Sequence, residues 1–282
     1  MKHQERVAAL RAIQDNKAPL FFMLGPCSIE SEDHALKTAD FLKRLSEKLS
    51  FPLIYKSSFD KANRLSKSSY RSIGFDEGLR ILEKVRSEFE LPIVTDVHES
   101  SQIPAVAEVA DVIQIPAFLC RQTDLLCAAG ASGKIVNIKK GQFLPPEGMA
   151  LAAEKVAATG NNHIWLCERG FTFGYNNLVV DFRGFSIMKQ TGYPVVFDAT
   201  HAVQRPAGQG NCSGGDRQFV GDLAISAVAQ GIAGLFMEVH EEPEKAPCDG
   251  PNMVRLSQLE SLIAYLMQLD AWVKKTSKPE IF

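Results

Sequence analysis

Several ionisable residues of this 282-residue chain stand directly after short apolar runs, where buried strands would end. Lys56 follows the run 53–55, and Lys61, Asn63 and Arg64 come within the next eight residues. Lysine offers a point charge and arginine a planar fork, and both suit phosphate or carboxylate groups. One such loop is explained as well by ordinary solvated cations. Because the same arrangement recurs along the chain, we interpret it as a binding site.

Each of the apolar runs along the chain leads into or contains polar or ionisable groups. In chain order these groups are Cys27, Lys56 with Ser57, Asp96 with His98, Gln114, Lys139 with Lys140, Glu168 with Arg169, Asp198 with His201, and Glu238 with His240 and Asp249. A charge inside an apolar strand is costly unless it is paired or ligated. Structural ion pairs explain one or two such positions, but not a recurrence at run after run.

This set divides by chemistry into cations and candidate metal ligands. Five cations would converge on one site, which indicates one polyanionic substrate or two anionic ones: Lys56, Lys61, Arg64, Lys139 and Arg169. Four further side chains offer one sulfur, one nitrogen and two oxygen ligands: Cys27, His201, Glu238 and Asp249. Such a mixture suits Zn²⁺ or Fe²⁺, with Mn²⁺ as an alternative. Each of the four, taken alone, is more often structural, as a lone buried cysteine usually is.

The elements that must position these groups form a regular pattern. Eight apolar runs rich in Val, Ile and Phe are expected to be strands: 19–25, 52–58, 92–98, 112–116, 135–140, 163–169, 194–200 and 234–240. Helical periodicity lies between them and after the last: 31–49, 76–90, 100–109, 122–131, 147–159, 179–191, 216–231 and 254–274. Continuous apolarity is typical of strands in a parallel sheet. We therefore expect a single (β/α)8 barrel over residues 1–282, with 1–17 as a short helical extension. A doubly wound open sheet is the alternative.

Composition narrows the class of protein. The formal net charge of −2 argues against a nucleic-acid or anionic-membrane surface. No run approaches the length of a membrane span, and no signal peptide follows the charged N-terminus. The six cysteines form no CxxC pair, so we expect reduced thiols and a cytoplasmic protein. The Gly-rich stretch 205–217 has the composition of a mobile lid or of an inconsequential connector.

Longer motifs resemble one enzyme family, the 3-deoxy-D-manno-octulosonate 8-phosphate synthases, from about Leu20 to about Leu269. The motifs that carry the resemblance are Gly-Pro-Cys-Ser-Ile-Glu-Ser at 25–31, Lys-Ser-Ser-Phe-Asp-Lys-Ala-Asn-Arg at 56–64, Thr-Asp-Val-His-Glu at 95–99, Gln-Ile-Pro-Ala-Phe-Leu-Cys-Arg-Gln-Thr-Asp at 114–124, Asn-Ile-Lys-Lys-Gly-Gln-Phe at 137–143, Glu-Arg-Gly at 168–170, Phe-Gly-Tyr-Asn-Asn at 173–177, Phe-Asp-Ala-Thr-His at 197–201 and Cys-Asp-Gly-Pro at 248–251. Any one of them is weakly specific, whereas the set is highly specific.

The resemblance implies a barrel enzyme, usually a homotetramer, with two small-molecule substrates. It would condense phosphoenolpyruvate with D-arabinose 5-phosphate, release phosphate and make the eight-carbon sugar acid of lipopolysaccharide. By similarity, Lys56, Gln114, Lys139 and Arg169 would hold phosphoenolpyruvate, and Asn63 and Arg64 the pentose phosphate. Ser57, Asp96 and Ala117 join the implied substrate site, and Arg121 would reach in from a neighbouring subunit. Lys56, Lys61, Lys139 and His201 are the implied catalytic residues, with Lys61 or His201 as candidates for moving protons.

The resemblance also bears on the metal. The family divides into metal-dependent and metal-independent forms, and the latter has Asn where this chain has Cys27. The chain therefore resembles the metal-dependent form, with Cys27, His201, Glu238 and Asp249 as ligands. Gly141 agrees with that form, whereas Cys248 is more usual in the metal-independent one.

Two other functions remain open from the sequence. A 3-deoxy-D-arabino-heptulosonate 7-phosphate synthase would use erythrose 4-phosphate on the same barrel. That sister family typically has Lys-Pro-Arg-Thr where this chain has residues 61–64, so Asn63 is the discriminating position. A non-catalytic phosphosugar-binding protein is the other alternative. It would not need a metal site beside two anion sites.

Overall fold

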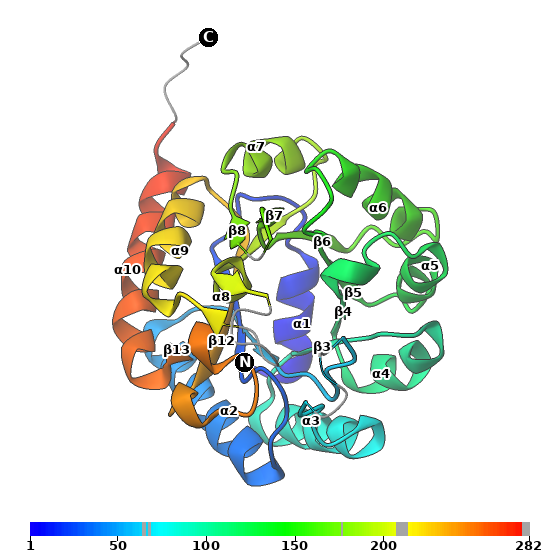
Figure 1. Ribbon diagram of the computed structural model, residues 1–282, viewed down its shortest axis with the longest axis vertical. Coiled ribbons are helices and arrows are strands. Elements are labelled where there is room, and N and C mark those ends of the chain that lie inside the picture. The colour runs from blue at the N-terminus through cyan, green and yellow to red at the C-terminus, as the bar shows by residue number, and fades with distance from the viewer. Residues whose placement is uncertain (64–65, 67–68, 176, 207–213, 278–282) are drawn as a thin grey trace.

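The barrel strands form one closed parallel sheet (Figure 1). The structure is a computed structural model that describes residues 1–63, 66, 69–175, 177–206 and 214–277. The barrel strands follow one another around the sheet in sequence order: β1 (Phe21–Gly25), β2 (Leu53–Lys56), β3 (Ile93–Asp96), β4 (Val112–Ile115), β5 (Ile135–Lys139), β6 (Ile164–Glu168), β9 (Val195–Asp198) and β12 (Gly234–His240). β12 pairs in parallel with β1, from Phe21 opposite Gly234 to Gly25 opposite Glu238. This closure confirms the (β/α)8 prediction and excludes the open sheet.

Helices connect the strands and cover the outside of the barrel (Figure 1). Those of seven or more residues are α1 (His3–Arg11), α2 (Glu32–Leu49), α3 (Phe75–Phe89), α4 (Ile103–Val109), α5 (Thr123–Ala131), α6 (Gly148–Ala157), α7 (Arg183–Lys189), α9 (Val220–Ala229) and α10 (Leu256–Lys275). A single turn, α8 (Ala199–Ala202), follows β9 directly. Ser31 caps the N-terminus of α2, because its side chain accepts the backbone N–H of His34 at 3.2 Å. Among the described residues, no helix is long and apolar enough to cross a membrane.

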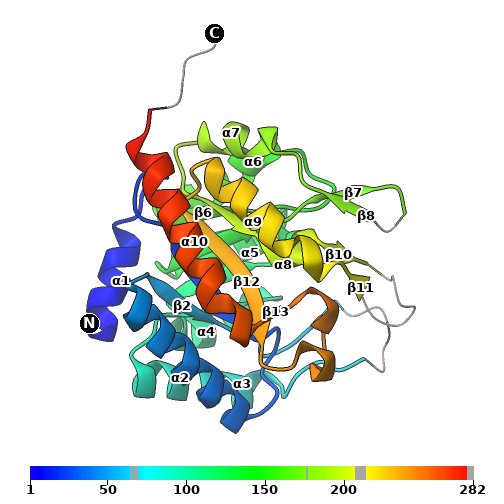
Figure 2. The same ribbon diagram turned by 90° about the vertical axis from the view of Figure 1, so that its left-hand side faces the viewer.

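Alternate strand residues serve two separate cores. Phe22 and Leu24 of β1 face outward into the large layer between sheet and helices. Phe21 and Met23 face inward, where they join side chains such as Trp165 in the barrel interior. Leu10 of α1 packs into this inner cluster. The extension 1–17 therefore covers the end of the barrel opposite the one that carries the β7–β8 and β10–β11 hairpins (Figure 2).

Two short hairpins that the apolar pattern of the sequence does not predict stand at that second end. β7 (Phe171–Phe173) pairs with β8 (Asn177–Val179), and β10 (Gln204–Arg205) pairs with β11 (Gly214–Gly215). The β7 and β8 residues are mostly exposed, so their sequence carries no buried apolar pattern. Within the stretch 205–217, Arg205 belongs to β10, and Gly214 and Gly215 form β11. Residues 207–213 lie outside the described residues. A further short strand, β13 (Val254–Arg255), pairs with β12.

Gly25, the last residue of β1, allows the backbones of β1 and β2 to approach each other closely. This approach lies just before the polar residues at the ends of these strands. A Cβ atom at Gly25 would lie 1.9 Å from the backbone oxygen of Lys56. We expect Gly25→Ala to lower the free energy of unfolding by at least about 1–3 kcal/mol, because backbone must move to admit the methyl group. Gly221→Ala is the matched control, since nothing lies within 4 Å of its Cβ position in α9. The control is expected to gain up to about 1 kcal/mol of helix stability. Equal stabilities of the two variants in urea unfolding would contradict this account.

Candidate active site

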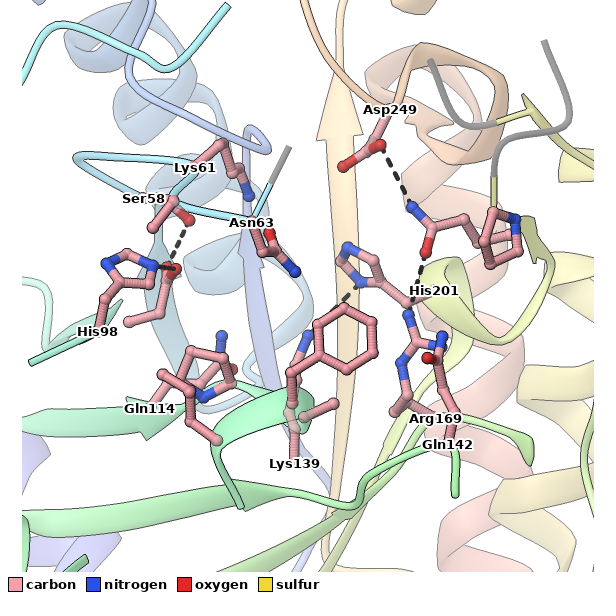
Figure 3. Close-up of a pocket in the computed structure, with 18 of the residues that line it drawn as sticks. Ser58, Lys61, Asn63, His98, Gln114, Lys139, Gln142, Arg169, His201 and Asp249 are labelled. Atoms are coloured by element: carbon pink, nitrogen blue, oxygen red, sulfur yellow. Dashed lines mark hydrogen bonds and ion pairs between the residues drawn. The ribbon is translucent and has the colours of Figure 1, made fainter. Parts of the chain in front are cut away.

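A cavity of about 450 Å³ opens where the barrel strands end (Figure 3). It brings together most of the residues that the sequence singled out: Lys56, Lys61, Asn63, Asp96, Gln114, Ala117, Lys139, Arg169, His201 and Asp249. Ser57 and Arg121 do not line it; Ser57 is buried, and Arg121 is exposed. Cys27 and Glu238 are fully buried and adjoin the lining through Asp249 and Lys56. Arg64 lies outside the described residues.

Lys139 and Arg169 line one wall of the cavity, and their positive charges favour the binding of an anion there. The Nζ atom of Lys139 pairs with the buried carboxylate of Asp198 and lies 4.0 Å from the centre of the Phe236 ring. Arg169 is only 6% exposed, and its Nη1 is a buried donor without a hydrogen-bond partner in the described part of the chain. Burial lowers the pKa of the Arg169 guanidinium from its ordinary value, although nearby carboxylates such as Asp198 oppose that effect. An anion at this wall would give Nη1 its missing acceptor.

Lys56 has a different environment from the one expected of a substrate-binding cation. Its Nζ donates to the backbone oxygen of Cys27 at 3.1 Å, to Ser58 Oγ at 3.1 Å and to Glu238 Oε1 at 3.0 Å. An ammonium group has three donors, so these protein groups use all of them. Lys56 therefore holds Glu238 in place and connects it with the Cys27 segment. Binding of Lys56 to a substrate stays a prediction.

Asp96 and Lys61 also line the cavity, and Ser58, Lys61 and His98 lie together on the side away from Arg169 (Figure 3). The Asp96 carboxylate accepts a hydrogen bond from Ser58 and lies 3.2 Å from His98 Nε2. Burial alone would raise the pKa of Asp96, but the hydrogen bond from His98 and the charges of Lys61 and Lys56 hold it well below its ordinary value. For Lys61, burial acts to lower the pKa, yet the charges of Cys27, Glu238 and Asp96 raise it well above its ordinary value. Lys61 is therefore an ammonium cation at neutral pH.

The lowered pKa of Asp96 predicts how stability depends on pH. Because its folded pKa lies below the unfolded value of about 4, the carboxylate stabilises the fold above about pH 4 and loses that effect as pH falls further. We expect Asp96→Asn to be less stable than the native chain at pH 7, and the difference to shrink below about pH 4 by at most about 1.4 kcal/mol per pH unit. Urea unfolding between pH 7 and pH 3 measures this. A difference that stays constant over that range would show that the Asp96 charge contributes nothing.

Three of the four predicted metal ligands lie together. Donor atoms of Cys27, Glu238 and Asp249 fall within 4.8 Å of one another. His201 adjoins this group, with Nε2 at 3.6 Å from Glu238 Oε1. The second oxygen of Glu238, Oε2, is buried and has no hydrogen-bond partner among the described residues. A buried carboxylate oxygen of this kind is costly to leave unpaired, so the donor set fits a divalent cation.

The orientation of His201 also fits a metal ligand. Asp198 caps the short helix α8 by accepting the His201 backbone N–H at 2.9 Å, and its other oxygen lies 2.7 Å from His201 Nδ1. A carboxylate can only accept, so Nδ1 carries the proton and Nε2 keeps its lone pair. Histidine ligands of metals are usually oriented by such a carboxylate. The charge that His201 carries when protonated, together with the charge of Lys139, holds the pKa of Asp198 well below its ordinary value, against the effect of burial.

Cys248 lies beside the same group. It packs with Cys27 and Met253 in one small cluster, and its Sγ lies 3.0 Å from Ser28 Oγ. The Cys27 thiol donates to Asp249 Oδ2 at 3.2 Å. Burial raises the pKa of Cys27 well above its ordinary value, whereas hydrogen bonding with Cys27 lowers the pKa of Cys248. The neighbourhood thus holds a second thiol that the predicted ligand set did not include.

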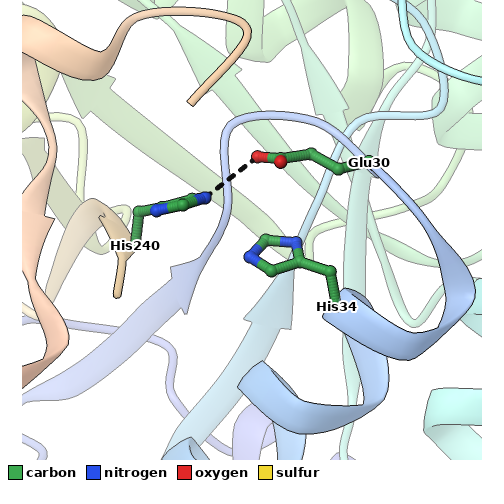
Figure 4. Close-up of side chains that lie close together, drawn as sticks. All are labelled: Glu30, His34 and His240. Atoms are coloured by element: carbon green, nitrogen blue, oxygen red, sulfur yellow. Dashed lines mark ion pairs between the residues drawn. The ribbon is translucent and has the colours of Figure 1, made fainter. Parts of the chain in front are cut away.

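A second group of potential ligands, formed by Glu30, His34 and His240, stands outside the cavity (Figure 4). His240 Nδ1 accepts the backbone N–H of Glu242 at 2.9 Å, so in the neutral ring Nε2 carries the proton. That nitrogen lies 3.2 Å from Glu30 Oε1 and has no lone pair for a metal. The pair instead connects the segment after Cys27 with the end of β12. The contact therefore has a structural role beside the predicted metal ligands.

Gln142 and Gln204 line the cavity, and Ser58 and His98 join them, although the sequence analysis assigned no role to these residues. Ser58 and His98 stand within the motifs at 56–64 and 95–99, but neither had an assignment of its own. Gln204 was missed because it belongs to β10, which the apolar pattern does not reveal. Its position three residues after His201, a candidate ligand, is the signal that could have found it.

Comparison with known proteins identifies the family. A model of the DAHP synthetase I family matches residues 4–275. A relative from Magnetococcus marinus is 60% identical over 255 residues, 90% of this chain and 89% of the relative. Relatives from Acidithiobacillus ferrooxidans and Pelobacter propionicus are 58% and 57% identical, over 93% and 92% of this chain and 93% and 95% of their own lengths. Each of the three is named 2-dehydro-3-deoxyphosphooctonate aldolase. The chain therefore belongs to the DAHP synthetase I family and, within it, to the 2-dehydro-3-deoxyphosphooctonate aldolases, which are also called 3-deoxy-D-manno-octulosonate 8-phosphate synthases.

Proposed function

We propose that this chain condenses phosphoenolpyruvate with D-arabinose 5-phosphate and water to give 3-deoxy-D-manno-octulosonate 8-phosphate and phosphate. The observation that carries the proposal is a cavity with cations on two opposite walls. Lys139 and Arg169 line one side, and Lys61 lines the other beside the amide of Asn63 (Figure 3). Two anionic substrates that repel each other in water would be held side by side between these walls.

Phosphoenolpyruvate binds, in this proposal, at the wall of Lys139 and Arg169. Arg169 supplies the buried Nη1 that has no partner among the described residues, and Lys139 adds a second cation. Gln114 lines the same cavity, and its Oε1 is taken by Asn137 Nδ2 at 3.1 Å. With the Gln114 oxygen facing Asn137, the NH₂ group of Gln114 is the end available to a substrate oxygen.

The pentose phosphate binds at the wall of Lys61 and Asn63, with Arg64 as a further phosphate ligand by resemblance. In the proposed reaction the enol carbon of phosphoenolpyruvate attacks the aldehyde carbon, and water adds at the carbon that bears the phosphate. The tetrahedral intermediate then expels phosphate. Because its pKa is raised, Lys61 acts in this proposal as a fixed cation beside the pentose phosphate rather than as a base.

Cys27, His201, Glu238 and Asp249 are the proposed ligands of a divalent metal, Zn²⁺, Fe²⁺ or Mn²⁺. When bound, such an ion supplies Lewis-acid polarisation of an oxygen of the aldehyde or of water. The chain's own residues prepare the site. Asp198 fixes the tautomer of His201, and Lys56 with Lys61 neutralises Glu238.

A homotetramer in which Arg121 serves the neighbouring active site also belongs to this proposal. Its support is that Arg121 is exposed and lies apart from the cavity lining of its own subunit. Light scattering of the native chain tests the assembly. Mixing Arg121→Ala subunits with subunits inactivated at Arg169 tests the shared site, because complementation restores activity only across an interface.

The decisive experiment measures phosphate release from phosphoenolpyruvate with arabinose 5-phosphate and erythrose 4-phosphate side by side. We expect a strong preference for arabinose 5-phosphate. A preference for erythrose 4-phosphate would assign the chain to the heptulosonate branch of the family. The family model that matches this chain bears the name of that branch, DAHP synthetase. No release with either sugar, even after Zn²⁺, Fe²⁺ or Mn²⁺ is added, would favour a binding protein. Asn63→Ala is expected to raise the KM for the pentose phosphate and leave that for phosphoenolpyruvate nearly unchanged.

A further inference from the structure

Gln204 connects the two halves of the active site. It lies on β10, where its pairing with Gly215 of β11 fixes the backbone. Its side-chain oxygen accepts from Arg169 Nη2 at 3.1 Å, and its side-chain nitrogen donates to Asp249 Oδ1 at 3.3 Å. The two dashed lines between Asp249 and Arg169 in Figure 3 mark these bonds. Gln204 therefore joins a residue of the anion-binding wall to a proposed metal ligand.

The chemistry of the two neighbours determines which way the amide faces. Arg169 can only donate, and the carboxylate of Asp249 can only accept. A flipped amide would set N–H against N–H and oxygen against oxygen, so a single orientation satisfies both. Glutamate at this position would repel Asp249, and a cation would repel Arg169. Glutamine has both the length and the mixed polarity that this bridge requires.

The bridge reaches the proposed anion-binding group at one end and the proposed metal ligands at the other. Beyond Arg169 Nη2 lies Nη1, the buried donor without a partner among the described residues. Beyond Asp249 Oδ1 lies Oδ2, which accepts from the Cys27 thiol at 3.2 Å. An anion that aligns the guanidinium thereby aligns the amide and the carboxylate. A cation bound to Cys27 and Asp249 aligns the same groups from the other side.

We propose that Gln204 is a positioning residue that couples phosphoenolpyruvate binding to metal binding. This inference rests on the proposed metal site and on the proposed role of Arg169. The ligand that binds first must order the side chains of the Arg169–Gln204–Asp249 bridge, which costs side-chain entropy. The ligand that binds second finds these side chains already ordered and does not meet that cost again. Because linkage is reciprocal, each ligand must tighten the other by the same factor.

The test measures this linkage without turnover. Metal-free protein is titrated with Zn²⁺ against a chromophoric chelator, with and without phosphoenolpyruvate and with no sugar present. Phosphoenolpyruvate is titrated by calorimetry with and without Zn²⁺. For the native chain we expect each ligand to tighten the other at least about fivefold.

Two variants isolate the bridge. Gln204→Met keeps the size of the side chain and removes both hydrogen bonds, and Gln204→Glu keeps the length but reverses the polarity toward Asp249. Both are expected to bind each ligand alone and to lose the coupling, so that the ratio of affinities falls toward one. Gln190→Met is the control, because Gln190 is an exposed glutamine that follows α7 and does not line the cavity. It should keep the native coupling. Circular dichroism checks that each variant is folded.

The outcomes separate this inference from the proposed function. Coupling that persists in both Gln204 variants, or that is absent from the native chain while both ligands bind, would overturn the bridge and leave the metal site standing. Failure of the native chain to bind Zn²⁺ at all would overturn the metal site, and the coupling with it. Phosphoenolpyruvate binding and condensation could still be observed in that case, and the proposed reaction would survive.

Discussion

Cys27→Ala is expected to abolish metal retention and to lower turnover by at least about 100-fold. Loss of a group that merely supports a metal ligand already costs 10–100-fold, and Cys27 is itself a proposed ligand. Its thiol lies 3.2 Å from Asp249 Oδ2 and within 4.8 Å of a ligand atom of Glu238, so its removal opens the group on one side. Metal analysis after dialysis and phosphate release with added Zn²⁺, Fe²⁺ or Mn²⁺ measure both effects.

Two further cysteine variants show whether the effect belongs to Cys27. Cys248→Ala removes the thiol that packs against Cys27, and it is expected to retain the metal. Cys127→Ala removes a half-buried thiol on α5 that lies next to the backbone oxygen of Lys155, and it should behave like the native chain. Full activity of metal-stripped Cys27→Ala would refute the metal hypothesis. Loss of metal in Cys248→Ala would assign Cys248 to the ligand set.

Asp198→Asn is expected to have the second large effect, on both stability and metal binding. Asp198 is fully buried and is the shared counter-charge of Lys139 and His201. Removing one member of a buried ion pair costs about 3–5 kcal/mol, because the remaining charge stays buried and unpaired. The asparagine NH₂ would also donate to His201 Nδ1, which moves the ring proton to Nε2 and removes the lone pair for the metal. We therefore expect metal affinity to fall by about 10–100-fold.

Urea unfolding and chelator competition measure these two effects separately. Asp181→Asn is the control, because this carboxylate pairs with Arg183, whose side chain is 86% exposed. Removing such an exposed pair is expected to cost only about 0–1 kcal/mol. If Asp198→Asn were to bind metal as tightly as the native chain, Asp198 would not be what orients His201. If it were also as stable as the native chain, the ion pair with Lys139 would contribute nothing.

The local pattern of the sequence determined which segments form strands and helices. It also determined which polar side chains stand at the ends of the strands. Apolar runs rich in β-branched residues can be read one at a time, so all eight barrel strands were predicted. Strand ends are also local features, and parallel strands bring their ends to one side of the sheet. For that reason Lys139, Arg169 and Gln114 could be assigned to one site. The motifs placed the chain in the correct family, which the comparisons confirm.

Contacts between strands were decided only by the closure of the barrel. Lys56 was predicted as a substrate-binding cation, yet all three of its donors meet Cys27, Ser58 and Glu238. The pairing of β1 with β12 brings Glu238 beside Gly25, and no local pattern contains that information.

The bridge through Gln204 arises in the same way. It requires that β10, the end of β6 and the loop after β12 meet at one end of the barrel. Side-chain type and spacing thus predict which groups enter the site. The register and closure of the sheet decide which of them neutralise one another and which are left available to a ligand.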